Sequence, residues 1–263
     1  MTWVLDLDGV VWLADRRIPG SAEAVARLRA RGQRVGLVTN NSSLTRAAYL
    51  QKLERLGVPT DPADLVTSAQ VAATLVEPGD RVLVCAGDGV REAVGERGAD
   101  VIAAVDTNGA ATGATGAAID AVVVGWTRDF DYDLLTRAMR AVRAGARLIG
   151  TNGDPTYPTP DGLLPGGGSL VAAVAYASGV DATLAGKPHA PMVAAVRARF
   201  GEIDVMVGDQ PQTDGLLARG LDCRFALVLS GVTGAADLPV DPAPDEVAAD
   251  LATLVGPEGA NSS

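Results

Sequence analysis

The chain has little cysteine and histidine, and neither residue type forms a recognisable site. Its 263 residues include two cysteines and one histidine. Cys85 and Cys223 lie in or beside apolar stretches, which predicts two buried free thiols of the kind kept reduced in the cytoplasm. Neither a CxxC pair nor a Cys/His cluster occurs, which argues against a structural zinc site.

Basic charge and long apolar runs are also scarce. The net charge of -10 argues against a nucleic-acid partner, because no basic stripe is available to neutralise phosphates. The negative net charge is compatible with a small phosphorylated ligand, since a few local hydrogen-bond donors or a metal ion suffice to hold one. The first residues do not have a signal peptide's basic region followed by an apolar core. No stretch approaches the ~18 uncharged apolar residues of a membrane span, so we expect a cytoplasmic protein without a membrane partner.

Hydrophobic residues at 48% and charged residues at 21% are typical of a folded globular chain. Short apolar runs predict strands, and segments with helical spacing alternate with them. Near-continuous Val/Ile/Leu strands separated by helices are typical of a parallel sheet covered on both faces, which predicts the α/β class. The expected strands are 3–6, 34–39, 81–85, 101–104, 121–125, 147–150, 205–207 and 225–229, and the expected helices are 21–32, 45–57, 91–98, 131–145 and 190–201, with one more helix in the tail.

The spacing of these elements predicts two domains, one inserted into the other. Residues 1–76 and 183–263 follow one β-α pattern and form a discontinuous core. Residues 77–182 hold strands and helices of their own and begin with the turn signal EPGD. An insertion of about 100 residues has the size of a small domain.

Two carboxylates end the first strand, in the segment LDLDGV. Asp6 and Asp8 are two residues apart, so they point to the same side of an extended strand, and Gly9 permits a turn directly behind them. Ligands of open parallel sheets bind at this end of the strands. The pair suits a hard cation or a nucleophile and its proton donor, although a solvated turn would use the same residues.

Three later segments also place polar groups where a core strand ends or in the turn that follows. GLVTNNSS ends in Thr39 and Asn40, which suit a phosphate cradle or a helix cap. AGKPHAP holds Lys187, either a neutraliser of phosphoryl charge or an ordinary surface lysine. The lone histidine, His189, lies beside it at a predicted helix start, without an acid–hydroxyl pair around it.

The last of the three segments, VMVGDQPQTDG, places Asp209 at a strand end and Asp214 on the following turn. Mg²⁺ takes one or two direct carboxylates and keeps several waters, which Asp6, Asp209 and a carbonyl near Asp8 would suit. An acid in an Asx-turn followed by a helix cap is the alternative.

The four segments DLDGV, TNNSS, GKP and GDQPQTD, in this order, resemble the haloacid dehalogenase (HAD) superfamily of phosphohydrolases. The similarity is greatest to subclass IIA, the 4-nitrophenylphosphatase and phosphoglycolate phosphatase type, which has a large α/β cap between the second and third segments. The stretch 150–179 is similar to that cap. The resemblance implies a Rossmann-like parallel-sheet core, an inserted smaller α/β cap, and hydrolysis of a small phosphorylated metabolite.

The resemblance also implies a role for each matching residue. Asp6 would be the nucleophile that forms an aspartyl-phosphate, and Asp8 the general acid and then the base for water. Thr39 and Asn40 would bind the phosphoryl group, while Lys187 neutralises its charge and holds Asp6. Asp6, Asp209 and the main-chain carbonyl of Asp8 would bind Mg²⁺. Asp214 would support the metal through water or through contacts with its ligands. Asp154, in the cap, would contact the substrate.

One departure and two alternatives accompany this interpretation. Gln210 and Gln212 stand where the subclass often has arginine and aspartate, which puts the contacts behind the metal in question. A signalling module phosphorylated on aspartate, or a weakly catalytic protein that binds phosphate ligands, would use similar residues. Oligomeric state is open, and related caps often mediate homodimers.

Overall fold

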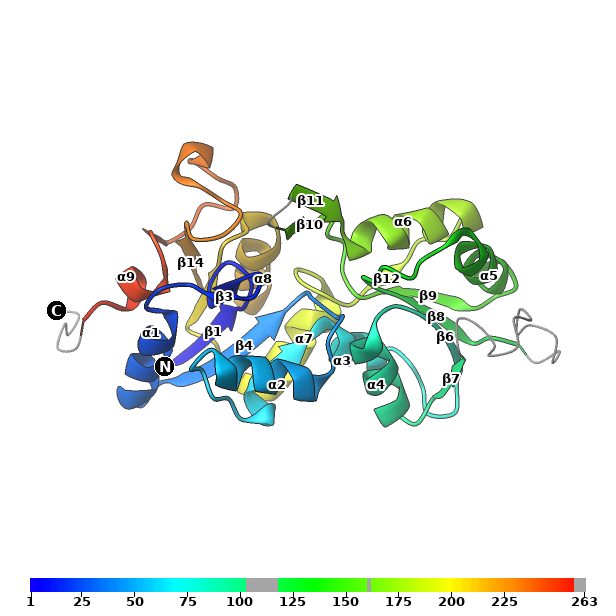
Figure 1. Ribbon diagram of the computed structural model, residues 1–263, viewed down its shortest axis with the longest axis horizontal. Coiled ribbons are helices and arrows are strands. Elements are labelled where there is room, and N and C mark those ends of the chain that lie inside the picture. Colours follow the sequence, from blue (N-terminus) through cyan, green and yellow to red (C-terminus); the bar gives the residue numbers. More distant parts are fainter. Residues whose placement is uncertain (103–117, 160–161, 258–263) are drawn as a thin grey trace. The chain divides into compact units, whose positions relative to one another are not determined.

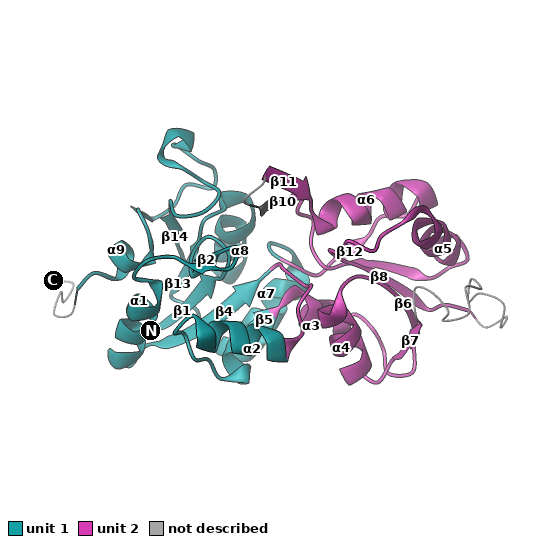
Figure 2. Cartoon of the chain, viewed as in Figure 1, with its two compact units in different colours: residues 1–39, 47–66, 187–263 teal, residues 40–46, 67–186 magenta. Residues whose placement is uncertain are grey.

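The computed structural model describes residues 1–102, 118–159 and 162–257. The chain divides into two compact units, the first comprising residues 1–39, 47–66 and 187–263, and the second residues 40–46 and 67–186 (Figure 2). Residues 40–46, 67–76 and 183–186, expected in the core, thus group with the inserted segment. Assignment of the units to a catalytic core and a cap stays a prediction.

A six-stranded sheet forms the centre of the first unit (Figure 1). Each strand pair in it whose register is resolved runs parallel, so the predicted α/β class is confirmed. A short antiparallel hairpin follows the first strand. The sheet has the order β15 (Glu246–Ala248), β14 (Arg224–Val228), β13 (Val205–Gly208), β1 (Thr2–Asp6), β4 (Arg34–Thr39), β5 (Leu65–Thr67), and the hairpin consists of β2 (Trp12–Leu13) and β3 (Arg16–Arg17).

Helices cover both faces of this sheet, because its strands are apolar on both sides. Leu5, Leu37 and Val207 share a buried cluster with side chains of α1, α2 and α9. On the other face, Gly36 has no side chain, and the ring of Phe200 from α7 packs closely over it. The helices are α1 (Ser21–Ala30), α2 (Arg46–Arg55), α7 (Ala190–Phe200), α8 (Leu216–Leu221) and α9 (Leu251–Val255).

The second unit has its own parallel sheet, of five strands, and its own core. Leu83, Val122 and Leu148 from neighbouring strands pack against α5 and α6 within that core. The sheet has the order β12 (Thr183–Leu184), β9 (Arg147–Gly150), β8 (Ala121–Val124), β6 (Arg81–Cys85), β7 (Asp100–Ile102). The remaining elements are the hairpin β10 (Thr156–Thr159) and β11 (Gly162–Pro165), with helices α3 (Ser68–Ala73), α4 (Asp88–Glu96), α5 (Tyr132–Arg143) and α6 (Gly167–Ser178).

Helix boundaries in the structure follow local chemistry. Asp131 caps α5 by accepting a hydrogen bond from the Leu134 N–H, and Thr67 with Gln70 forms a capping box on α3. Gly32 and Gly57, which follow α1 and α2, have φ of 71° and 82°. Residues with a Cβ rarely adopt that conformation, so glycine suits these helix ends.

Several details differ from the sequence prediction, which did not include the helices α3, α6 and α8. The tail forms a short strand, β15, before its helix α9, where only a helix was expected. Both thiols are free, but only Cys85 is buried, since Cys223 is partly exposed.

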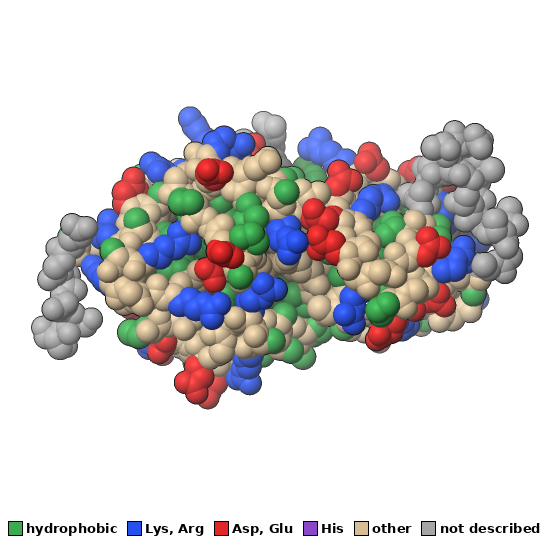
Figure 3. Space-filling view, turned by 90° about the horizontal axis from the view of Figure 1, so that it is seen from below, with side chains coloured by type: hydrophobic (Ala, Val, Ile, Leu, Met, Phe, Trp, Pro, Cys, Tyr) green, Lys and Arg blue, Asp and Glu red, His purple; other side chains and the backbone are tan. Residues whose placement is uncertain are grey.

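Charged side chains of both signs are intermixed on the face of the molecule shown in Figure 3. Among the described residues, we find no helix long and apolar enough to cross a membrane.

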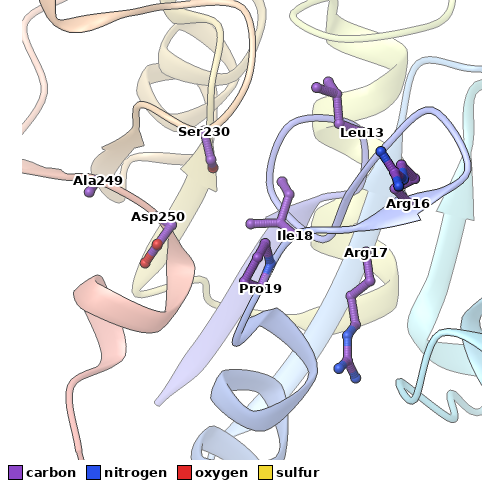
Figure 4. A pocket seen from close by; sticks show the side chains of 8 residues that line it. All are labelled: Leu13, Arg16, Arg17, Ile18, Pro19, Ser230, Ala249 and Asp250. Atoms are coloured by element: carbon purple, nitrogen blue, oxygen red, sulfur yellow. The ribbon is translucent and has the colours of Figure 1, made fainter. Parts of the chain in front are cut away.

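A surface cavity of about 360 Å³ lies in the first unit beside the β2–β3 hairpin. Figure 4 shows Leu13 and Arg16 of the hairpin at one side of the cavity, with Ser230 and Asp250 opposite. The predicted catalytic residues are not among those that line it.

Candidate active site

Four buried charged side chains meet at the carboxyl ends of β1 and β13. Asp6 is the last residue of β1, and Asp209 directly follows β13. The register pairs Leu5 with Val207, which sets the two strand ends side by side. Lys187 precedes α7, and Asp214 lies on a π-helical turn, Pro211–Gly215. The structure thus assembles four of the sequence-predicted residues from segments about 200 positions apart.

Lys187 forms two short ion pairs within this cluster. Its Nζ lies 2.7 Å from Oδ1 of Asp6 and 2.7 Å from Oδ1 of Asp214. The three residues are 2%, 5% and 0% exposed, so the lysine is not the surface residue that its turn sequence also allowed. Burying carboxylates this deeply requires a partner charge, and Lys187 supplies it.

Asp209 differs from its neighbours because one of its oxygens has no partner. The backbone N–H of Val232 donates to Oδ2 at 2.6 Å. Oδ1 is buried and, within the described residues, accepts no hydrogen bond. One carboxylate oxygen each of Asp6, Asp209 and Asp214 lies within 4.8 Å of the other two. An orphaned carboxylate oxygen in such a cluster fits the oxygen ligands that Mg²⁺ requires.

Asp214 has a different hydrogen-bonding pattern from Asp209. Its Oδ1 accepts from Lys187, and its Oδ2 accepts from the backbone N–H of Gln210 at 3.1 Å. Both of its oxygens are therefore engaged by protein donors, which fits support behind a metal better than direct ligation. The contact from position 210 comes from the main chain, so it does not depend on the residue being glutamine.

Glycines allow the backbone to close around the two acids of the last segment. Gly9 has φ of 84°, and a Cβ there would overlap the Asp209 carboxylate. The same holds for a Cβ at Gly231, while one at Gly208 would overlap Asp214. The turn after β1, which the sequence predicts from Gly9, therefore also makes room for an acid on another strand.

Burial and mutual repulsion shift the titration of these groups. Burial raises the pKa of Asp6 well above its ordinary value, against the opposing effect of Lys187. Burial and then repulsion by Asp214 raise the pKa of Asp209 to about 7. Burial alone would lower the pKa of Lys187, but Asp214 and Asp6 outweigh it and raise that pKa. The lysine is therefore fully charged, and the three carboxyl groups of the cluster share its single positive charge.

Asp8 lies on the turn after β1 and is held by Trp12. The indole Nε1–H of Trp12 donates to Oδ1 of Asp8 at 2.9 Å. Burial raises the pKa of Asp8, and the Trp12 hydrogen bond partly offsets that rise. A carboxyl group that keeps its proton more readily suits a general acid.

Of the remaining predicted residues, Thr39 belongs to the first unit and Asn40 and Asp154 to the second. Thr39 ends β4 and is 1% exposed. Asn40 donates through Nδ2 to both oxygens of Asp154, at 3.2 and 3.1 Å. Its carbonyl accepts hydrogen bonds from Ser68 and Asn152. The structure thus brings Asn40 and Asp154 together.

Sequence reasoning missed the residues that act on this site through the main chain or through distant loops. Val232 and Ser230 follow β14, and Ser230 Oγ donates to the carbonyl of Gly9 at 2.7 Å. Trp12 also went unnoticed, because an apolar strand residue gives no sign of a polar contact. His189 is the residue before α7, as predicted.

Comparisons with known proteins agree on the family of this chain. A family model described as haloacid dehalogenase-like hydrolase matches residues 3–100, and one described as HAD-hydrolase-like matches residues 184–254. Glycerol-3-phosphate phosphatase from Homo sapiens is 34% identical over 273 residues, covering 90% of this chain and 81% of that protein. A 5'-nucleotidase from Bacillus subtilis is 33% identical, covering 88% of each. The structure of a glycerol phosphate phosphatase from Mycobacterium tuberculosis in complex with magnesium has a TM-score of 0.84 at 33% identity, over 96% of this chain and 75% of that one.

Proposed function

The chain belongs to the haloacid dehalogenase-like hydrolases, and we propose that it hydrolyses a small phosphate monoester through an aspartyl-phosphate on Asp6. It is a phosphoric monoester hydrolase of subclass IIA and uses Mg²⁺. The observation that carries the role of Asp6 is its 2.7 Å pairing with buried Lys187, beside the unpartnered oxygen of Asp209.

In the first step an oxygen of Asp6 attacks phosphorus, and the bond from phosphorus to the ester oxygen breaks. Asp8 gives its proton to that departing oxygen, so the alcohol leaves neutral. Lys187 neutralises negative charge on the transferring phosphoryl group, and Thr39 helps to bind and position it. Phosphoryl transfer depends mainly on such positioning and charge stabilisation, so a few well-placed groups suffice.

In the second step water attacks the phosphorus of the aspartyl-phosphate. Asp8, now a carboxylate, takes a proton from that water, and the Asp6 carboxylate is released with inorganic phosphate. Splitting the reaction in this way replaces one difficult displacement by two easier ones. Asp8 is regenerated in its protonated form, which closes the cycle.

The donor set fits magnesium. Asp6, Asp209 and the main-chain carbonyl of Asp8 would hold the ion, with Asp214 behind them. Bound there, Mg²⁺ supplies positive charge that offsets the repulsion between Asp6 and an incoming phosphate. Asp214 keeps Lys187 in place through its 2.7 Å ion pair.

The substrate is a small phosphorylated metabolite, and the second unit selects its leaving group. The relatives named above act on glycerol 3-phosphate and on 5'-nucleotides, so the phosphoryl group is common and the leaving group varies. Asp154, held by Asn40, is the candidate contact in that unit. Location in the cytoplasm and a homodimer through the cap stay predictions.

The test compares Asp6→Asn with Asp15→Asn, a control at an exposed acid of the β2–β3 hairpin. Phosphate release from 4-nitrophenyl phosphate and a panel of phosphate monoesters is measured with Mg²⁺ and with EDTA. Asp6→Asn and EDTA should each reduce turnover to background, and Asp15→Asn should not. Acid quenching during turnover should place one phosphoryl group on the peptide that contains Asp6.

Other outcomes identify the alternatives. A long-lived phosphoryl group on Asp6 without phosphate release would indicate a signalling module. Binding of phosphate esters without either reaction would indicate a binding protein. Turnover that survives Asp6→Asn would refute the nucleophile assignment.

A further inference from the structure

Trp12 is a buried aromatic residue whose one polar side-chain atom forms a hydrogen bond with the carboxyl group of the proposed general acid. It is 1% exposed, and its Nε1–H donates to Oδ1 of Asp8 at 2.9 Å. The backbone reinforces this pairing. The N–H of Gly9 donates to the Trp12 carbonyl at 2.7 Å, and the Leu7 carbonyl accepts from the Trp12 N–H at 3.1 Å. The chain between Asp8 and Trp12 therefore folds back on itself as one tight unit.

The ammonium of Lys52, from α2, lies over the indole ring of Trp12. Its Nζ lies 4.3 Å from the centroid of the Trp12 ring and donates to the carbonyl of Ala14 at 2.8 Å. A cation over an aromatic face and a hydrogen bond to the next turn of the hairpin both oppose rotation of the ring. The indole N–H is thus aimed at Asp8 by contacts that do not involve substrate.

From this geometry we infer that Trp12 is a positioning residue for proton transfer to the leaving group. An indole nitrogen can only donate, so Oδ1 of Asp8 is kept as an acceptor in both protonation states. The carbonyl oxygen of a protonated carboxyl group accepts more strongly than its hydroxyl oxygen, so this hydrogen bond favours the proton on Oδ2. Trp12 therefore biases the proton toward Oδ2 and orients the carboxyl group of Asp8. The inference rests on the proposed role of Asp8 and adds a residue to it.

The poorer the leaving group, the more its departure depends on receiving a proton from the general acid. A 4-nitrophenolate departs without a proton, whereas an alkoxide from an alkyl phosphate needs one. General acid catalysis contributes about 10²–10⁴-fold where it is needed. Misplacing the acid should therefore slow alkyl phosphates and leave aryl phosphates with good leaving groups almost untouched. A merely structural defect would slow both alike.

The chain offers a matched control in Trp3, on β1 of the same unit. Its Nε1 is buried and, within the described part of the chain, has no hydrogen-bond partner. Trp12→Phe and Trp3→Phe each replace an indole by a phenyl ring, but only the first removes a hydrogen bond to a predicted catalytic group. Replacing Trp12 by 3-benzothienylalanine, in which sulfur takes the place of N–H in an otherwise similar ring, serves if Trp12→Phe folds poorly.

The measurement is kcat/KM with Mg²⁺ for 4-nitrophenyl phosphate and for the best alkyl phosphate of the panel, beginning with glycerol 3-phosphate. The value of kcat/KM reports on the steps from free enzyme and substrate up to phosphoryl transfer onto Asp6. Departure of the leaving group is part of that transfer, so a defect in protonating it lowers kcat/KM. In the Trp12 variants we expect the alkyl value to fall about tenfold or more and the aryl value less than about threefold. Trp3→Phe should leave the ratio of the two values unchanged.

Equal losses on both substrates, or no loss on either, would overturn the inference. A selective loss in Trp3→Phe as well would also overturn it. The proposed function fails separately, when the wild-type chain hydrolyses no monoester at all. Wild-type turnover with unselective losses in the Trp12 variants therefore refutes the positioning role alone.

Discussion

Replacing Lys187 by methionine removes the one positive charge found within 3 Å of Asp6 and Asp214 in the described structure. Loss of one partner from a buried ion pair costs about 3–5 kcal/mol, because the other charge stays buried without compensation. Lys187 serves two carboxylates that are 5% and 0% exposed, so we expect a loss of about 4 kcal/mol at pH 8 without metal. Methionine keeps most of the volume and the flexible apolar stem, so lost packing contributes little.

The assay is urea unfolding in EDTA, followed by circular dichroism. With a denaturant slope of about 3 kcal/mol per molar urea, the expected loss of about 4 kcal/mol lowers the midpoint by about 1.3 M. Arg17→Met is the control, since it removes an exposed ion pair with Glu23 and should cost less than about 1 kcal/mol. Adding Asp214→Asn to Lys187→Met should restore about half of the loss, because one uncompensated charge disappears.

Two results would refute this reasoning. A Lys187→Met midpoint within about 0.3 M of wild type would mean that the acids are not held by this charge. A double variant less stable than the single one would mean that Asp214 stabilises the fold by contacts other than its ion pair. Millimolar Mg²⁺ should raise the midpoint of Lys187→Met more than that of wild type, since the cation then enters a more negative site.

Two further predictions concern titration. In EDTA the wild-type chain should gain stability as the pH falls from 8 to 6: burial raises the pKa of Asp209 from 3.8 to about 7, so the folded state binds a proton in this range that the unfolded state does not. A urea midpoint that declines toward pH 6 would contradict it. Burial also raises the pKa of Cys85 to about 12 and of Cys223 to about 11, so at pH 8 both thiols of the folded chain should alkylate at least ~100-fold more slowly than after unfolding. Mass spectrometry after iodoacetamide treatment measures both sites, and rapid modification of Cys85 in the folded chain would count against its burial.

The central strands and the acids that end them could be predicted from the sequence because their signal is local. The runs 34–39 and 147–150 have the bounds of β4 and β9. Asp6 and Asp209 end or directly follow apolar strands, and parallel strands bring such ends to one edge of a sheet. Spacing and general chemistry therefore sufficed to place them together.

The features that could not be predicted depend on contacts with residues far away in the sequence. β15 has three residues in a segment with helical spacing, and its pairing with β14 makes it a strand. The Val232 N–H that binds Asp209 belongs to the main chain, so its side chain carries no signal. Asn40 was expected at the phosphoryl group, and its contact with Asp154 spans 114 positions of the chain. Local pattern cannot specify contacts of this range.

The strand order also determines when the sheet of the first unit can be completed during synthesis on the ribosome. β1 lies between β4 and β13, so the strand that carries Asp6 keeps one open edge until residues 205–208 have been made. Residues 67–186 of the second unit are contiguous and can fold during that wait. At about 5–20 residues per second, the interval between β4 and β13 lasts roughly 10–30 seconds. Through that time the nascent first unit exposes an unpaired apolar strand edge, which makes it a natural client for chaperones that bind extended segments.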